Sequence, residues 1–99
     1  MSKIRVVGET RTPKHEVEEA VNDHLYAKLA EIEKNISELE STEARLTTTY
    51  HTNWEDFKTK FEKGQLSEDA DIDFVEWEST IELLRQLRRE RDMLKDALE

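Results

Sequence analysis

The chain has 99 residues, of which 39% are charged and 35% hydrophobic, and its formal net charge is −9. With two glycines, one proline and a mean hydropathy of −0.87, it has too few turn residues and apolar residues for a sandwich or barrel. The balance is typical of long amphipathic helices, so we predict an all-α fold. Nucleic acid and anionic membranes are disfavoured as partners, because both would repel an acidic protein.

The N-terminal arm, residues 1–12, begins with a short apolar run that reads as one β-strand from Lys3 to Gly8. A lone strand needs another chain, or a copy of itself, to satisfy its backbone hydrogen bonds; otherwise it is disordered. The run is too short for a signal peptide or a membrane span, and the chain has no cysteine for disulfides or thiolate chemistry. We therefore expect a cytoplasmic protein.

A single domain is predicted over residues 13–99, and its first element is a long helix over 13–51. Thr12 suits the N-cap and Pro13 the first helical position, and no glycine or proline follows until Gly64. The apolar side chains alternate in steps of four and three, which is the spacing of a helix-packing seam with one polar member. The seam consists of Leu25, Leu29, Ile32, Ile36, Leu39, Glu43, Leu46 and Tyr50.

After a break near 51–53, we predict a short helix over 53–63, an acidic loop over 64–72 and a return helix over 73–98. Thr52 and Glu55 have the spacing of a capping box, and Gly64 is placed to end the short helix in a left-handed conformation. The return helix has a seam of its own, which Phe74, Ile81 and Leu83 widen. That seam consists of Trp77, Thr80, Leu84, Leu87, Arg91, Leu94 and Leu98.

The two seams have nearly the same length, about 37 Å at 1.5 Å per residue, and this match predicts an antiparallel helical hairpin. Folding one seam onto the other aligns Leu25 with Leu98, Ile36 with Leu87, Leu46 with Trp77, and the polar pair Glu43 with Thr80. Six of the seven aromatic residues lie between Tyr50 and Trp77. We expect these rings to form a small core that closes the bent end.

The return helix is predicted to run out opposite Leu25, which leaves residues 1–24 beyond the hairpin. They combine an unpaired strand with an exposed apolar strip, a combination typical of an interaction surface. The candidate partner-binding residues are Ile4, Val6, Val7, Val17, Ala20 and Val21.

The sequence offers little for catalysis or for a cofactor. Asp69, Asp71 and Asp73 alternate as at the start of an EF-hand, but Phe74 and Thr80 replace its glycine and its bidentate glutamate. The three histidines have no metal-binding spacing, and no nucleophile, base and orienting group are brought together by a motif. In the basic segment "RQLRRERD", Glu82 and Asp92 are spaced to pair with Arg85 and Arg88. We expect no metal, no cofactor and no enzymatic activity.

The segments "IRVVGETRTPKHEVEEAV" and "TTYHTNWEDFKTKFEKGQLSEDADIDFVEWESTIELL" resemble the small acidic antitoxins of prokaryotic, especially archaeal, toxin–antitoxin pairs. The shared features are a Tyr–x3–Trp/Ser–x2–Phe turn, a Gly-x-Leu acidic loop and an F-x-E-W restart. The resemblance implies a protein that binds and blocks a partner toxin, and the acidic charge of this chain favours a basic one. Many antitoxins also bind DNA through a ribbon–helix–helix N-terminus, but no turn splits this helix after Pro13.

Two other functions compete with the antitoxin hypothesis. One is a homo-oligomeric coiled-coil scaffold or prefoldin-like holdase, in which residues 1–24 pair with their own copies. The other is a nucleic-acid-binding regulator that uses the basic segment. A protein partner, another copy of the chain, or both are therefore the expected partners.

Overall fold

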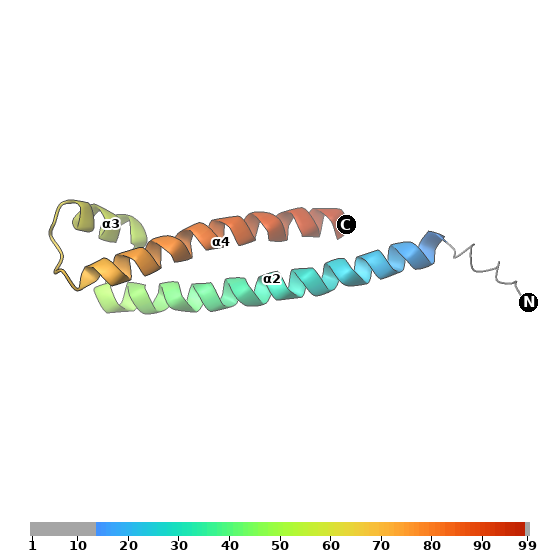
Figure 1. Ribbon diagram of the computed structural model, residues 1–99, viewed down its shortest axis with the longest axis horizontal. Coiled ribbons are helices and arrows are strands. Elements are labelled where there is room, and N and C mark those ends of the chain that lie inside the picture. Colours follow the sequence, from blue (N-terminus) through green and yellow to red (C-terminus); the bar gives the residue numbers. More distant parts are fainter. Residues whose placement is uncertain (1–13, 99) are drawn as a thin grey trace, which may run out of the picture.

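The computed structural model describes residues 14–98, with side chains from residue 17 onward. These residues form three helices: α2 (Lys14–Tyr50), α3 (Trp54–Glu62) and α4 (Ala70–Leu98). Helices α2 and α4 lie side by side and antiparallel, and α3 lies beside α4 near the bend (Figure 1). The predicted all-α hairpin is confirmed for this part of the chain. The predicted strand from Lys3 to Gly8 lies outside the described residues.

The long helix α2 ends at Tyr50, where the backbone turns. His51 adopts a left-handed conformation with φ 53°, and the Thr52 amide donates to the Thr47 carbonyl at 3.3 Å. On the seam of α2, Ile32, Ile36 and Leu46 are buried. The apolar spacing of the sequence therefore does identify the face of α2 that packs.

The short helix α3 begins after Asn53, whose side chain accepts a 2.8 Å hydrogen bond from the Asp56 amide. The predicted cap at Thr52 is therefore wrong by one residue, because asparagine caps a helix at least as well as threonine. At the other end Gly64 has φ 68°, and its amide donates to the Phe61 carbonyl at 3.0 Å. The left-handed glycine that the sequence predicted there is confirmed.

The return helix α4 begins at Ala70, earlier than the predicted start at Asp73. Backbone hydrogen bonds from the Ala70 amide to Ser67 and from the Asp71 amide to Glu68 form its first turn. Ala70 is only 1% exposed and lies in the core beside the aromatic rings. Burial of this small side chain explains the earlier start, since a loop backbone in that position would leave polar groups unsatisfied.

Two hydrophobic clusters hold the hairpin together. The first, which we call the aromatic cluster, closes the bent end and includes the predicted pair Leu46 and Trp77. Its buried members are Leu46, Trp54, Phe57, Ala70 and Trp77, with Tyr50, Leu66, Phe74 and Ile81 packed against them. Ring centroids lie 4.8 Å apart for Phe57 and Trp77 and 4.0 Å apart for the stacked pair Phe61 and Phe74. The predicted aromatic core is therefore present.

The second cluster, which we call the middle cluster, lies along the helix pair. Its buried members are Ile32, Ile36 and Leu84, and Leu39, Leu87 and Leu94 pack against them. Ile36 and Leu87, aligned from the sequence, fall in this same cluster. Three ion pairs cross between α2 and α4 at the surface: Arg45 with Glu76 at 2.7 Å, Glu40 with Arg88 at 2.9 Å, and Glu33 with Lys95 at 3.8 Å. They agree with the antiparallel direction that the apolar layers impose.

Candidate functional site

The first turns of α2 extend beyond the end of α4, and we call residues 14–24 the overhang. Figure 1 shows α2 continuing past the C-terminal end of α4. Every described side chain from residue 17 to residue 24 is exposed, and the half-buried Leu25 is the first that is not. The hairpin therefore stops covering α2 where the equal-length seams predicted that it would.

The overhang carries the apolar seam of α2 into solvent. Val17 and Val21 are each 51% exposed, and they precede Leu25 in steps of four, so the three side chains lie along one face of the helix. Burying a valine side chain fully is worth about 1.5–3 kcal/mol. A partner that covered this face would bury the exposed parts of both valine side chains, and each burial would contribute to the free energy of binding.

Acidic side chains surround these two valines. Glu18, Glu19 and Asp23 are all exposed in the overhang. The surface therefore presents an apolar strip bordered by negative charge, which suits a partner whose apolar contact is bordered by basic residues.

Three of the six predicted partner-binding residues can be placed. Val17 and Val21 share the exposed face, and Ala20 is exposed beside them. Ile4, Val6 and Val7 lie outside the described residues.

The basic segment of α4 forms pairs that differ from the predicted ones. Arg88 pairs with Glu40 on α2 at 2.9 Å instead of with Asp92 on its own helix, and Asp92 accepts from Arg91 at 3.1 Å. Guanidinium groups reach across the hairpin because an arginine stem is long enough to span neighbouring helices. Arg88 and Arg91 of this segment are thus engaged in ion pairs, whereas Arg85 and Arg89 form none with the described residues.

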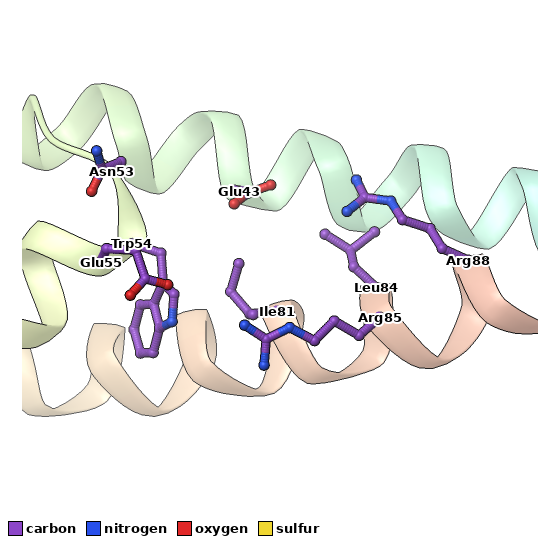
Figure 2. Close-up of a pocket in the computed structure, with 8 residues that line it drawn as sticks. All are labelled: Glu43, Asn53, Trp54, Glu55, Ile81, Leu84, Arg85 and Arg88. Carbon is purple, nitrogen blue, oxygen red and sulfur yellow. The ribbon is translucent and has the colours of Figure 1, made fainter.

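A hollow opens between the three helices beside the aromatic cluster (Figure 2). Glu43 points into it from α2, Ile81 and Leu84 line it from α4, and the Arg85 side chain extends along α4 toward Trp54. Its remaining lining residues are Asn53, Glu55 and Arg88. Two carboxylates and two guanidinium groups line this hollow, so their charges compensate each other rather than select an anion or a cation.

The polar layer predicted from the sequence is only half formed. Thr80 is buried, and its hydroxyl donates a 2.8 Å hydrogen bond to the Glu76 carbonyl of its own helix. Glu43 is half-buried in the hollow, and no hydrogen bond joins it to Thr80. The hydroxyl is satisfied within α4, so this layer does not fix the register through a direct bond.

At the bent end, two polar contacts tie α2 to the first turns of α4. The Tyr50 hydroxyl donates to Asp73 Oδ2 at 2.5 Å, and this hydrogen bond, helped by partial burial and by the Asp73 charge, raises the pKa of Tyr50 to about 12. The hydrogen bond and charge of Glu76 also raise the pKa of Arg45. Asp73, considered above as a calcium ligand, is thus already engaged by a phenol.

The acidic loop shows no metal-binding geometry in the described part of the chain. No group of three or more His, Cys, Asp or Glu side chains between residues 17 and 98 is arranged to hold a metal ion. Trp77 carries the one buried polar side-chain atom of that region without a hydrogen-bond partner, the indole Nε1. Trp77 belongs to the aromatic cluster.

Sequence reasoning missed a second exposed apolar row, on α4. Leu83 was expected to widen the inner seam, but it is 46% exposed, and Ile72, Val75 and Met93 are 78%, 61% and 70% exposed. The signal was available in the spacing, because these residues recur in helical steps on a face separate from Trp77, Thr80 and Leu84. Leu83 was instead assigned to the inner seam, together with the aromatic residues of α4.

The chain matches no protein-family model, no curated protein and no solved structure. No helix between residues 14 and 98 combines the length and apolar character needed to cross a bilayer.

Proposed function

We propose that this chain is a non-catalytic protein-binding module of the antitoxin type, which binds a basic toxin and blocks it. The observation that carries the proposal is the overhang: a helix that continues its apolar seam past the end of its own partner helix. Val17 and Val21 are each half exposed there, although the same seam is buried at Ile32 and Ile36. In this proposal a helix of the toxin takes the place next to the overhang that α4 leaves vacant.

The charge of the overhang supports a basic partner. Glu18, Glu19 and Asp23 border the valines, and the whole chain carries a formal net charge of −9. Complementary charge accelerates association and disfavours wrong partners. The apolar strip forms the part of the interface from which water is excluded on binding. The resemblance of the sequence to small acidic antitoxins points in the same direction.

The experiment is a growth-rescue assay with the protein encoded next to this chain in its genome. The neighbour should arrest growth when expressed alone, and co-expression of this chain should restore growth. The double variant V17D/V21D should fail to restore it, because it places charge in the apolar strip without touching the hairpin core. Y26D, which places the same charge at a 56% exposed position of α2 away from the apolar strip, is the matched control and should still restore growth.

Binding must be measured directly as well, by calorimetric titration of the purified neighbour with wild-type chain and both variants. A loss of about tenfold or more in affinity for V17D/V21D is expected, since about 1.4 kcal/mol corresponds to a factor of ten. A neighbour that neither arrests growth nor binds would reject the antitoxin function. Equal binding by V17D/V21D and wild type would reject the overhang as the site.

A further inference from the structure

The apolar residues exposed on α4 lie along one face of the helix, with polar residues between them. We call this row of residues the outer stripe; its positions are spaced by three or four residues and lie within one arc of the helix surface. Its members are Ile72, Val75, Ser79, Leu83, Gln86, Glu90, Met93 and Ala97. Every member is exposed except Glu90, which is half-buried. The stripe is distinct from the inner face, where Trp77, Thr80 and Leu84 are buried.

The surface is also hollowed along this stripe. One shallow hollow is lined by Ile72 and Val75 with their acidic neighbours Asp71 and Glu76. A second lies between Leu83 and Leu87 of α4 and Leu39 of α2, and a third lies between Met93 and Leu94 of α4 and Ile32 of α2. Apolar side chains and hollows that alternate along a helix pair are what another helix needs in order to pack ridges into grooves.

The charge along α4 is divided between its two halves. Residues 70–84 contain five carboxylate side chains and no basic one, whereas residues 85–98 contain five basic side chains and three acidic ones. Complementary charge thus requires an occupant that is basic opposite the first half of α4 and acidic opposite the second. The same helix turned end for end meets this requirement.

We propose that two copies of this chain pair antiparallel through the outer stripe of α4, forming a two-fold symmetric assembly of two hairpins. A two-fold axis near residues 84–85 places Leu83 of one copy beside Gln86 of the other, and Ile72 beside Ala97. It also places Glu82 opposite Arg89 of the second copy, twice by symmetry. A parallel arrangement would instead bring the acidic halves of both helices together.

Glu82 and Arg89 are suited to this role. Both are exposed, they border the same side of the stripe, and neither forms an ion pair with any residue from 17 to 98. Glu–Arg pairs beside an apolar seam set orientation and register in helical assemblies. Because Ser79, Gln86 and Glu90 interrupt the stripe with polar groups, the association is reversible. The proposal does not depend on the antitoxin function, since the stripe and the overhang share no residue.

The first test is the mass of the purified chain over a concentration series, by sedimentation equilibrium or by light scattering after size exclusion. The mass should rise with concentration from 11.7 kDa toward twice that value. L83K/M93K should stay monomeric throughout, with unchanged helical circular dichroism, because both side chains are exposed in the single hairpin. The control Y26K removes a residue that is 56% exposed but lies off the stripe, on α2, and it should still dimerise.

Charge reversal tests the orientation. E82R and R89E should each weaken dimerisation, and the double variant E82R/R89E should recover it, because the two reversed charges again meet across the axis. Spin labels give a distance readout, since the chain has no cysteine and accepts single labelled sites. Labels at I72C should be roughly 35–40 Å apart in the antiparallel dimer, at 1.5 Å per residue from the axis, but adjacent in a parallel one.

Three results would overturn the proposal. The first is a wild-type chain that stays at monomer mass at every concentration. The second is a dimer that persists in L83K/M93K, which would place the interface elsewhere. The third is a short distance between the I72C labels, which would reject the antiparallel register. Dimerisation of E82R/R89E as weak as that of the two single variants would reject it as well.

Discussion

The hydroxyl of Tyr50 donates a 2.5 Å hydrogen bond to Oδ2 of Asp73 and so connects the last residue of α2 to the first turn of α4. The two residues are far apart in sequence but adjacent at the bend, beside the aromatic cluster. Since the bond requires the phenolic proton, it raises the pKa of Tyr50 to about 12. This contact makes the hairpin sensitive to alkaline pH.

We expect the Tyr50 contribution to stability to be lost at high pH. The pKa of a tyrosine is about 10 in an unfolded chain, and the folded value is higher. The stabilisation is therefore fully present below about pH 10 and disappears as the pH rises through the folded value near 12. Y50F should reduce the free energy of unfolding by about 1–2 kcal/mol at neutral pH, and its difference from wild type should shrink over this alkaline range.

Urea unfolding of wild type and Y50F at a series of pH values measures this difference. Y26F is the control, because Tyr26 is exposed and lies outside both clusters. A gap between wild type and Y50F that stays constant through pH 12 would contradict the assignment of the pH dependence to the Tyr50–Asp73 bond.

The aromatic cluster should dominate stability. Phe57 has no exposed surface, and its ring lies 4.6 Å from Tyr50 and 4.8 Å from Trp77. F57A should cost about 3–5 kcal/mol, which is a large share of the 5–15 kcal/mol typical of a domain. Y26A changes a side chain that is 56% exposed and lies outside both clusters, so it should alter stability by less than about 0.5 kcal/mol.

Chemical denaturation followed by tryptophan fluorescence suits this comparison, because Trp54 and Trp77 both lie in the aromatic cluster. An F57A variant as stable as Y26A would show that the aromatic cluster contributes little to the stability of the hairpin.

Two left-handed residues flank α3, and they should respond oppositely to substitution. Gly64 has φ 68° with no atom within 4 Å of where a Cβ would lie, so G64A introduces backbone strain and no clash. It should destabilise by about 1 kcal/mol. His51 already bears such strain at φ 53°, so H51G should be neutral or slightly stabilising, as relief of strain offsets the greater freedom of the unfolded chain. Thermal melts of both variants check the pair, and equal destabilisation would contradict it.

Much of this fold could be predicted from the sequence because its signals are periodic and local. The seam spacing of Ile32, Ile36 and Leu46 identified the packed face of α2, and Gly64 identified the end of α3. The start of α4 could not be predicted, because it depends on burial of Ala70 against rings from other helices. The Arg88–Glu40 pair was missed for the same reason: local spacing cannot show which carboxylate lies across a hairpin.

Of the two candidate surfaces, the overhang could be predicted from the sequence and the outer stripe could not. The exposure of Val17 and Val21 follows from comparing the lengths of two seams, and the structure agrees with it. The exposure of Leu83 depends instead on which side of α4 faces α2. The sequence of α4 alone does not show which of its two apolar faces that is. A helix with two apolar faces presents two equally valid seams until its partner is placed.

Hydrogen exchange should reveal a gradient of stability along α2. Amides in residues 17–24 belong to a segment with no buried side chain, whereas those near Ile36 and Leu46 belong to the two clusters. Because exchange requires local opening, and helix turns without tertiary packing open at little cost, the overhang should exchange far faster than residues 32–46. Addition of a partner that covers Val17 and Val21 should slow exchange in the overhang and leave the clusters unchanged. Uniform protection along α2 in the free chain would contradict the gradient, and would indicate that another surface already covers the overhang.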